Sequence, residues 1–315
     1  MSARPNVVVV GSFMMDLIVR ADRMPKEGET IVGKEFQRAP GGKGANQAVA
    51  AARLGGNVTM IGRVGDDLFG QDQIQSLKAA GIETRYITVD PEAPTGVGSI
   101  TLDDSSGNNR IIIIPGANMR CTPEDVQRAD DALRAADVIL LQLEIPIEVN
   151  RYVLKRAREL GKPVIFNPAP ARPLDRELLE LATVVTPNET EAEALTGIEI
   201  RSVEDAERAA LALRNQGVQT VIITLGGKGS LLYDASGPVL APTWPVEVVD
   251  TTAAGDAFNG AFAVAYAKGM PMAEALRFAN AAGALTVTGM GAQPSIPTLE
   301  RLEAFLKERE SASEN

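Results

Sequence analysis

Short apolar runs rich in β-branched residues recur along the chain, and each is bounded by glycine, proline or polar residues. The clearest are NVVVVGS from Asn6, DVILLQLE from Asp137, PVIFNPAP from Pro163, TVVTPNE from Thr183 and TVIITLGG from Thr220. A strand buried on both faces of a parallel sheet has such an uninterrupted apolar run. The pattern therefore predicts several strands of one buried sheet.

Helical patterns occupy the stretches between these runs. EDVQRADDALRAA follows Thr122-Pro123, a capping residue and a first-turn proline, whereas IEVNRYVLKRARELG ends at Gly161 and SVEDAERAALALRNQG ends at Gly217. These start and stop signals are typical of amphipathic helices. The alternation predicts a three-layer α/β sandwich with a mostly parallel central sheet, and such sheets bind ligands beyond the carboxyl ends of their strands.

Two segments depart from this alternation. GVGSITLDD, SSGNN and RIIIIPG, which follow Thr95, predict a β-hairpin, and GETIVGKEFQRAP from Gly28 predicts another extended stretch. We expect a small β-sheet lid, formed by about residues 13–40 and 95–118, on a single domain spanning residues 1–315. The alternative is an extension of the sheet edge with no catalytic role.

Charge and hydropathy narrow the classes of partner. The 315 residues carry a formal net charge of −10, which disfavours nucleic acid and anionic membrane surfaces as partners. No stretch reaches the roughly 18 uninterrupted apolar residues of a membrane span, and the apolar run after Asn6 is too short for a signal peptide. These features predict a soluble cytoplasmic protein.

The chain contains no histidine and a single cysteine, Cys121. Catalytic triads with histidine, histidine-ligated metals, internal disulfides and multi-cysteine zinc sites are therefore excluded. Any catalysis has to use carboxylates, lysines, backbone amides or an oxygen-bound metal.

GGKGANQAVAAARLGG, from Gly41, places a glycine-rich turn at the start of an alanine-rich helix. Glycines let a ligand approach the backbone, and free N–H groups at a helix start attract anions or hydroxyl oxygens. The motif is not a Walker A loop, because Gly44 follows Lys43, and Gln47 breaks the GxGxxG pattern. The alternative is a tight turn with close helix packing.

TLGGKGS, from Thr224, follows a strongly apolar strand, and such glycine turns at a sheet edge commonly bind nucleotide phosphates. Lys228 precedes Gly229 instead of serine or threonine, so this segment is not a Walker loop either. A plain hairpin turn into SLLYD is the competing interpretation.

PNETEAEALTG, from Pro187, places Glu189, Glu191 and Glu193 at the entry of a helix. Carboxylates in a first turn complement the helix dipole, which is the simpler explanation. The functional hypothesis is that Asn188 and Glu191 organise hydrated Mg²⁺ near a polyphosphate, because Mg²⁺ prefers oxygen ligands and retains water.

DTTAAGDAF, from Asp250, places Asp256 at the start of a helix of small residues, where it could act as the N-cap. The run Ala253, Ala254 and Gly255 could also direct successive N–H groups at one point beside this carboxylate. That combination suits phosphoryl transfer, with the amides stabilising charge on the phosphoryl group and Asp256 deprotonating the attacking hydroxyl.

These four segments, in this order, resemble the signature set of the ribokinase family, within the phosphofructokinase-B group of carbohydrate kinases. The likeness runs from about Val7 through Phe305 and includes NPAPA at Asn167 and GAQPSIP at Gly291. The resemblance implies a central α/β sheet with a β-lid, usually joining two subunits into a homodimer. It also implies transfer of the γ-phosphoryl group of ATP to the 5-hydroxyl of D-ribose, with Mg²⁺ and activation by K⁺.

The resemblance also assigns roles to particular residues. Asp256 matches the catalytic base, and Ala253, Ala254 and Gly255 match the anion hole. The positions that hold the sugar are Ser12, Met14, Asp16, Gly41, Gly42, Lys43, Gly44, Asn46, Glu144 and Asp256. The ATP positions are Asn188, Thr224, Leu225, Gly226, Gly227, Lys228, Gly229, Gly255, Asp256 and Asn280, and the K⁺ positions are Asp250, Thr252, Thr286, Gly289, Gly291 and Ser295.

Two positions depart from the family pattern. Met14 replaces the asparagine of GSxNxD that touches sugar, so a deoxy or related sugar stays an alternative to ribose. Ala253 replaces a glycine, which matters only if the backbone there requires a positive φ. A fructose or nucleoside kinase of the same group and a non-catalytic sugar-binding regulator also stay open. The missing dinucleotide fingerprint disfavours an NAD-dependent dehydrogenase.

Overall fold

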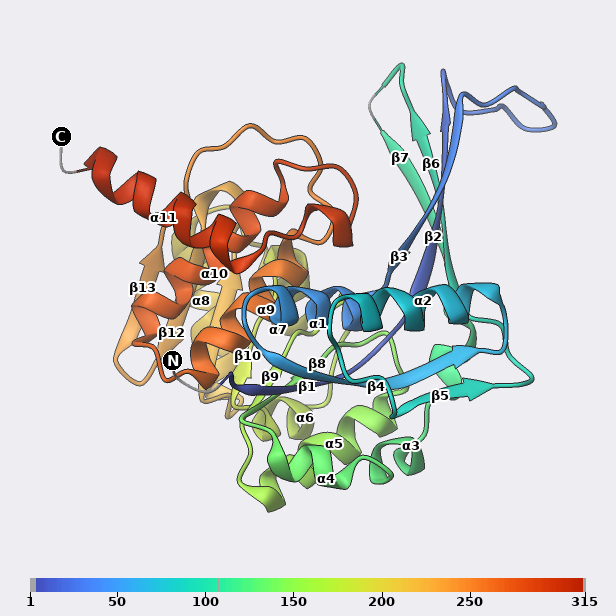
Figure 1. The fold of residues 1–315 in the computed structure, drawn as a ribbon. Helices are drawn as coiled ribbons and strands as arrows, with labels where there is room; N and C mark the ends of the chain where they lie inside the picture. Colours follow the sequence, from blue (N-terminus) through green and yellow to red (C-terminus); the bar gives the residue numbers. More distant parts are fainter. Residues whose placement is uncertain (1–3, 107, 314–315) are drawn as a thin grey trace.

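Within residues 4–106 and 108–313, which the computed structural model describes, nine strands pair into a central sheet with the order β13-β12-β11-β10-β9-β8-β1-β4-β5 (Figure 1). The strands are β1 (Asn6–Val10), β4 (Asn57–Gly65), β5 (Ile87–Asp90), β8 (Val138–Leu141), β9 (Val164–Phe166), β10 (Val184–Val185), β11 (Thr220–Thr224), β12 (Ser230–Asp234) and β13 (Gly237–Ala241). The pairs β11–β12 and β12–β13 are antiparallel, whereas the other neighbours pair in parallel. The predicted strands and the mostly parallel sheet are confirmed.

Alternate residues of the buried strands face two different hydrophobic cores. In β1, Val7 and Val9 belong to one core, and Val8 and Val10 belong to the other. The first core is covered by α1 (Lys43–Arg53), α2 (Leu68–Ala79), α9 (Ala254–Ala267), α10 (Met272–Thr286) and α11 (Leu299–Ser313). The second is covered by α3 (Pro123–Gln127), α4 (Asp130–Ala135), α5 (Ile147–Leu160), α6 (Arg176–Leu181), α7 (Glu189–Thr196) and α8 (Val203–Asn215). These layers explain why the strands are apolar throughout.

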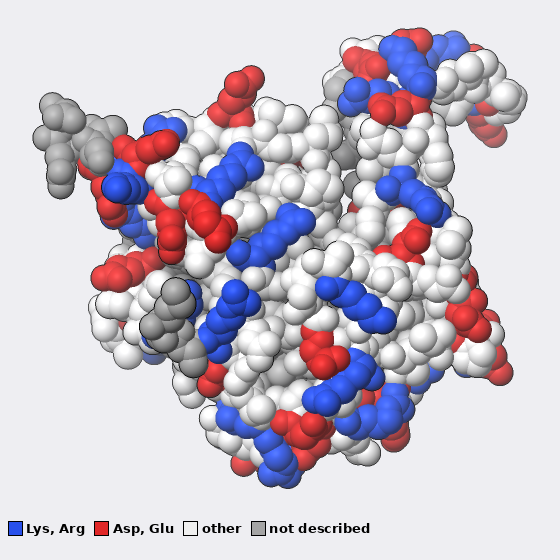
Figure 2. All heavy atoms as spheres, in the orientation of Figure 1, with Lys and Arg blue, Asp and Glu red and all other residues white. Residues whose placement is uncertain are grey.

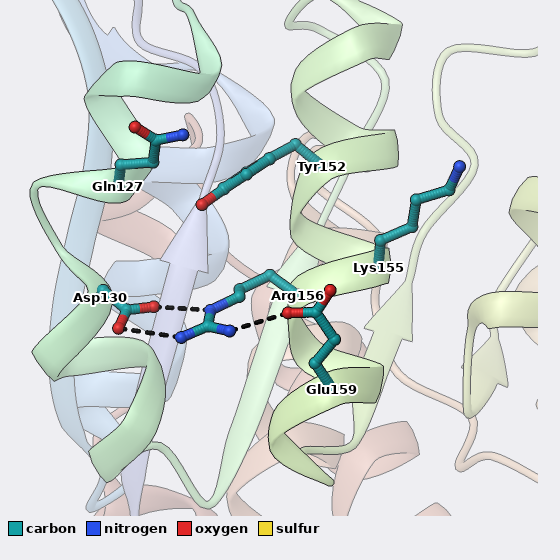
Figure 3. Close-up of a pocket in the computed structure, with 6 residues that line it drawn as sticks. All are labelled: Gln127, Asp130, Tyr152, Lys155, Arg156 and Glu159. Atoms are coloured by element: carbon teal, nitrogen blue, oxygen red, sulfur yellow. Dashed lines mark hydrogen bonds and ion pairs between the residues drawn. The ribbon is translucent and has the colours of Figure 1, made fainter.

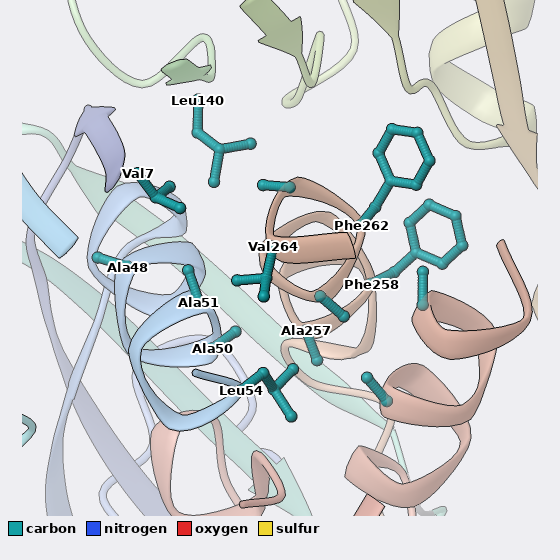
Figure 4. Close-up of a cluster of buried hydrophobic side chains, with 14 of the residues drawn as sticks. Val7, Ala48, Ala50, Ala51, Leu54, Leu140, Ala257, Phe258, Phe262 and Val264 are labelled. Atoms are coloured by element: carbon teal, nitrogen blue, oxygen red, sulfur yellow. The ribbon is translucent and has the colours of Figure 1, made fainter. Parts of the chain in front are cut away.

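Helices α1 and α9 approach each other closely because both are built from small residues. A methyl group at Gly260 would lie 2.5 Å from the Ala50 Cβ atom and 2.8 Å from the Ala51 nitrogen. Figure 4 shows Ala50 and Ala51 of α1 facing α9, with Phe258 and Phe262 on the far side of α9. This contact brings the first turns of the two helices together.

One predicted helix is divided in two. The pattern after Thr122-Pro123 predicts one continuous helix, but α3 ends at Gln127 and α4 begins at Asp130, with Ala129 at φ −106° and ψ 20°. Val126, Ala129 and Leu133 keep a helical spacing across the break and are all buried. The hydrophobic periodicity of the sequence therefore does not reveal the break between α3 and α4.

A second sheet of four strands rises from the sandwich (Figure 1). Its order is β3-β2-β6-β7, with β2 at Met14–Ala21, β3 at Glu35–Gly41, β6 at Gly96–Asp103 and β7 at Asn109–Ile114. Strand β2 pairs antiparallel with β3 and parallel with β6, which places Asp16 opposite Ala39 and Gly98. The separate smaller sheet agrees with the predicted fold class.

No helix among the described residues has the length and apolar character needed to cross a bilayer. On the face drawn in Figure 2, lysine and arginine side chains are interspersed with aspartate and glutamate.

Candidate active site

The glycine turn before α1 lies against the loop that follows β1. Gly42 is the N-cap of α1 and has φ 92°, a conformation that favours glycine. A Cβ atom at Gly44 would lie 2.4 Å from the Ser12 nitrogen. The close-packing interpretation of this motif is therefore correct for the backbone, and it brings the polar side chains of α1 to the sheet edge.

Glu144, in the loop after β8, joins this turn to the first loop. The Ser12 hydroxyl donates to Glu144 Oε2 at 2.5 Å, and the Lys43 backbone N–H donates to the same oxygen at 2.9 Å. The Gly44 N–H donates to the Ser12 hydroxyl oxygen at 3.3 Å. The structure thus brings together four of the predicted sugar positions.

Asp16 extends from β2 toward this cluster. A Cβ atom at Gly41 would lie 2.5 Å from Asp16 Oδ2, and one at Gly98 would lie 2.6 Å from Oδ1, so both glycines make room for the carboxylate. Burial raises the pKa of Asp16 to about 7, and the carboxylates of Glu144 and Asp256 add to the rise. The motifs did not single out Gly98, whose only sequence signal is its place in the predicted hairpin.

Met14 lies two residues before Asp16 on the same face of β2. Its side chain is buried, its sulfur accepts a weak hydrogen bond from the Asn118 amide at 3.8 Å, and a Cβ atom at Gly96 would lie 2.7 Å from the sulfur. The slot that holds asparagine in the family pattern therefore contains an apolar side chain here.

Asp256 lies in the first turn of α9 and is buried. Its Oδ2 accepts a hydrogen bond from the Asn46 amide at 3.0 Å, and its Oδ1 accepts one from the Gln47 amide at 3.1 Å. The proposed N-cap role is not found, because Ala253 is the N-cap and no side chain caps α9. The carboxylate points at α1 instead of back at its own helix.

A single lysine side chain faces several carboxylates in this cluster. Burial lowers the pKa of Lys43, but Asp256, Glu144 and Glu191 outweigh it, and the pKa is raised. Burial raises the pKa of Asp256, whereas Lys43, Asn46 and Gln47 oppose that rise. The lysine therefore stays charged and favours the ionised form of Asp256.

The backbone of the expected anion hole is strained at one residue. Ala253 has φ 61°, and among the described residues it is the one non-glycine position with a positive φ. Alanine there costs about 1 kcal/mol relative to glycine. The Ala254 N–H donates to the Thr251 carbonyl at 3.3 Å, so one of the three expected donors closes a turn. Gly255 lies exposed in the first turn, where helix N–H groups lack an intrahelical acceptor.

A cleft of about 410 Å³ opens beside Gly255. Seven of the ten predicted nucleotide positions line it, namely Asn188, Thr224, Gly226, Gly227, Gly229, Gly255 and Asn280. Three predicted positions, Leu225, Lys228 and Asp256, are not part of this lining. Leu225 is buried in the second core, and Lys228 is exposed.

Sequence reasoning missed one wall of this cleft. It consists of Thr243, Trp244, Pro245, Val246 and Val248 from the loop before α9, and of Glu189, Thr251, Phe258, Gly283, Ala284 and Val287. The sequence signal for it was the apolar stretch PTWPVEVV in a segment with no strand or helix pattern. An apolar wall opposite polar glycine turns suits a flat heteroaromatic ring attached to phosphates.

The alternative prediction for TLGGKGS, a plain hairpin turn, is also correct. Gly226–Lys228 makes a 3-10 turn between β11 and β12, which pair antiparallel. Gly226 has φ 52° and Gly229 has φ 97°, and a Cβ atom at Gly229 would lie 2.2 Å from the Ala241 carbonyl oxygen. The turn is a hairpin that also lines the cleft.

Asn188 and Glu191 form the capping box of α7. The Asn188 side chain accepts from the Glu191 N–H at 2.8 Å, and Glu191 Oε2 accepts from the Asn188 N–H at 2.9 Å. The Asn188 amide also donates to Glu191 Oε1 at 3.0 Å. The helix-start explanation is therefore correct, and burial raises the pKa of Glu191.

The predicted K⁺ positions gather into two adjoining groups. Asp250 Oδ1 accepts from the Thr252 N–H at 2.9 Å and from its hydroxyl at 2.6 Å, and Asp250 Oδ2 accepts from the Gly291 N–H at 2.9 Å. A Cβ atom at Gly289 would lie 3.0 Å from the Ser295 Cβ atom and 3.9 Å from the Thr286 carbonyl oxygen. The Asp250 N–H joins the groups by donating to the Val287 carbonyl at 3.2 Å.

The donor set of this loop consists of one carboxylate, hydroxyls and carbonyls, which fits a weakly bound hard cation. Among the described residues, no group of three or more aspartate, glutamate or cysteine side chains is arranged to hold a metal ion.

A hollow of about 460 Å³ lies elsewhere, between α5 and the α3–α4 segment (Figure 3). Arg156 donates to Asp130 at 2.7 and 3.0 Å and to Glu159 at 2.7 Å within it. These three charged side chains pair with one another, and we assign the hollow no role.

The chain matches the model of the pfkB family of carbohydrate kinases over residues 4–299. It is 46% identical over 301 residues to a ribokinase of Bacillus subtilis, covering 96% of this chain and 99% of the relative. It is 40% identical over 302 residues to a deoxyribokinase of Salmonella typhi, covering 96% and 98%. The structure resembles Arabidopsis thaliana ribokinase complexed with ribose and ATP, with a TM-score of 0.90 and 39% identity over 96% of this chain and 99% of that one.

Proposed function

The chain belongs to the pfkB family of carbohydrate kinases, and from that premise we propose that it phosphorylates D-ribose at the 5-hydroxyl with ATP. One observation carries the proposal. The buried Asp256 carboxylate lies on α9 next to Gly255, which lines the open cleft. It also accepts hydrogen bonds from Asn46 and Gln47 of α1, the helix that carries the polar cluster. A base in that position lies between a polyol subsite and a nucleotide subsite.

The roles follow from the chemistry of each group. Asp16, Lys43, Asn46 and Glu144 would hold sugar hydroxyls, and Asn46 Oδ1 is a buried acceptor with no partner among the described residues. Asp256 would take the proton of the attacking hydroxyl, and the N–H groups of the first turn of α9 would stabilise charge on the phosphoryl group.

The decisive experiment is a coupled assay of ADP formation over ribose, 2-deoxyribose, fructose, adenosine and uridine, comparing kcat/KM. We expect ribose to have the highest value. A higher kcat/KM for fructose or a nucleoside would contradict the proposed substrate, and ADP formation from none of them would contradict the proposed activity.

A second candidate substrate is 2-deoxyribose, and Met14 is the observation that favours it. Its buried thioether replaces a polar side chain beside Asp16 and supplies no strong hydrogen-bond partner for a hydroxyl. The relative from Salmonella typhi that is named deoxyribokinase adds support.

Met14→Asn tests this directly. We expect the ratio of kcat/KM for ribose to that for 2-deoxyribose to rise by about tenfold, the factor that one added hydrogen bond supplies. Met15→Leu, a conservative change at the neighbouring buried position on the opposite face, is the control and should leave the ratio unchanged. An unchanged ratio in Met14→Asn would remove Met14 as the determinant.

We also propose that Mg²⁺ accompanies ATP and that a monovalent cation binds the Asp250 loop. Mg²⁺, when bound, would neutralise negative charge on the phosphate groups. Asn188 and Glu191 would reach its water ligands, because a carboxylate has about four acceptor sites and the capping box leaves some of them free. The cation would lie among Asp250, Thr252, Thr286, Gly289, Gly291 and Ser295, next to the strained Ala253 turn.

Exchange of K⁺ for Na⁺ at fixed ionic strength tests the cation site. We expect kcat to fall by roughly fivefold or more, the usual range for coupling between two sites. Asp250→Asn should remove the difference between the two ions while the protein stays folded by circular dichroism. Equal activity of the unsubstituted protein in both salts would contradict the proposal.

The small sheet supports a further proposal, that two copies associate through it. Ile111, Ile112, Ile113 and Ile114 of the edge strand β7 are 53%, 68%, 51% and 55% exposed. Consecutive residues of a strand point to opposite faces, so both faces of this edge are apolar and uncovered in the single chain. Contiguous apolar surface of this kind marks an interface.

Light scattering tests the association. We expect a dimer at micromolar concentration, and a monomer when Ile111→Lys and Ile112→Lys together place one charge on each face. Asn109→Lys adds the same charge to the same strand at a polar position and should leave the dimer intact. A monomer across all concentrations of the unsubstituted protein would contradict the proposal.

A further inference from the structure

Four polar side chains are buried around Asp256. Gln47, Asn167, Thr186 and Asn259 are 0%, 7%, 1% and 1% exposed. They come from four separate segments, namely α1, the loop after β9, the loop after β10 and the second turn of α9. Buried polar groups are costly unless they are hydrogen-bonded, so their arrangement requires an explanation.

The first part of the arrangement runs from Asp256 to the sheet edge. The Gln47 amide nitrogen donates both to Asp256 Oδ1 and to Asn167 Oδ1, each at 3.1 Å. The Asn167 amide nitrogen then donates to the Thr186 carbonyl at 2.9 Å. Both hydrogens of the Gln47 amide are therefore used.

The second part returns to the same turn of α9. The Thr186 hydroxyl donates to Asn259 Oδ1 at 2.6 Å, and the Asn259 amide nitrogen donates to the Gly255 carbonyl at 2.8 Å. Gly255 is bonded covalently to Asp256, so the hydrogen bonds form a closed ring. Thr186 also lies two residues before Asn188, which lines the cleft.

Every member of the ring has one allowed orientation. The carbonyls of Thr186 and Gly255 accept only, which fixes the amide nitrogens of Asn167 and Asn259 toward them. The Gln47 carbonyl oxygen accepts from the Gln142 amide at 2.7 Å, which directs the Gln47 nitrogen at Asp256. The Gln47 amide can therefore only donate to Asp256 Oδ1. This arrangement complements an ionised carboxylate, because a proton on Oδ1 would require an acceptor where Gln47 presents a donor.

We infer that Gln47, Asn167, Thr186 and Asn259 form a positioning ring that fixes the Asp256 carboxylate in its ionised, proton-accepting form relative to the turn that faces the cleft. The inference rests on the proposed function, because it assigns Asp256 as the base. None of the four ring members is itself a predicted sugar position or part of the cleft lining, so they act through Asp256 and Gly255 and are positioning residues.

Other charged groups also face Asp256 and contribute to its pKa. They are Asp16 from β2, Lys43 from α1, Glu144 after β8 and Glu191 from α7. Burial raises the pKa of Asp256, and the hydrogen bond from Gln47 lowers it. Loss of that bond raises the pKa further. A base works when ionised, so the acid limb of the activity profile then moves to higher pH.

Gln47→Met is the principal test, because methionine keeps the length of glutamine and donates no hydrogen bond. The measurement is kcat against pH from 5 to 9 at saturating ATP and sugar, with the sugar that has the highest kcat/KM. We expect about a tenfold lower kcat at neutral pH and an acid limb about one pH unit higher, as for the loss of one charge-assisted hydrogen bond.

Asn150→Leu is the matched control. Asn150 is a fully buried amide that donates to the Gln142 carbonyl at 2.9 Å, outside the ring. It should reduce stability without moving the acid limb. An equal shift in Asn150→Leu, or no shift in Gln47→Met, would overturn the inference.

Thr186→Val is a second variant that tests the ring if Gln47→Met does not fold. Valine has the shape of threonine, so this change opens the ring at one hydroxyl and leaves the bond from Gln47 to Asp256 in place. We expect a shift of the acid limb in the same direction and smaller, with KM for both substrates unchanged. An unmoved limb would overturn the ring. An unsubstituted protein with no sugar kinase activity would instead overturn the proposed function, and the inference with it.

Discussion

Asp256→Asn is expected to lower kcat by about 10² to 10⁴, the range that a positioned acid or base supplies, while KM for sugar and ATP changes little. Asparagine keeps the shape of the side chain and removes the group that accepts the proton. Only one of its two terminal atoms accepts hydrogen bonds, so Asn46 or Gln47 loses its partner at this position. The measurement is steady-state kinetics with folding checked by thermal unfolding.

Asp137→Asn is the control for this change. Asp137 is exposed and accepts a hydrogen bond from the Asn6 N–H at 2.7 Å. It precedes β8 at the amino end of the strand, whereas the candidate site lies at the carboxyl ends. We expect normal turnover in this variant. Near-normal turnover in a folded Asp256→Asn variant would show that another group removes the proton.

Lys43→Met is expected to have the second-largest effect, acting on both binding and stability. Lys43 is the cation that faces Asp256, Glu144 and Glu191 in this cluster. Its loss leaves like charges together with no compensating charge, so we expect KM for the sugar to rise by roughly 100-fold and the free energy of unfolding to fall by about 3 kcal/mol. Enzyme kinetics and urea denaturation measure the two effects.

The pH dependence of this variant follows from the sign of each shift. Lys43 lowers the pKa of both Asp256 and Glu191, so its removal raises both. The carboxylates can then relieve their repulsion by binding protons at low pH. The loss of stability should therefore be larger at pH 8 than at pH 6.

Lys78→Met, a change at an exposed position near the end of α2, should alter neither KM nor the free energy of unfolding. If Lys43→Met lost the same stability at pH 6 and pH 8, the like-charge explanation would be wrong. The contribution of Lys43 would then come from the packing of its aliphatic stem.

Local signals were sufficient for the backbone of the site. Glycine-rich turns are predicted at GGKG and LGGKG, and Gly42 and Gly229 in these turns adopt a positive φ, which favours glycine. The start of α7 was recognised because carboxylates and an asparagine cap leave a pattern within a few residues, and Asn188 forms that cap. These features depend on neighbours in the chain, so the sequence alone carries them.

Other features left no local pattern. Trp244 and Val248 form a wall of the cleft only because the loop before α9 folds back beside Asn280 and Gly283 of α10. The sequence does not predict the positive φ of Ala253, since alanine is found mostly at negative φ. The replacement of a glycine at this position was its only sequence signal.

By itself, then, the sequence determined the α/β layering, the mostly parallel sheet, the separate small sheet and the identity of Asp256 as the candidate base. It could do so because strand burial, helix periodicity and glycine turns repeat over short distances along the chain. Only the tertiary structure decided that Asp256 does not cap its own helix and that Lys43 faces three carboxylates. It also decided that one ring of hydrogen bonds is closed by Gln47, Asn167, Thr186 and Asn259. The contact between Gln47 and Asp256, for example, joins residues 209 positions apart, and the strand order and the close approach of α1 to α9 bring them together.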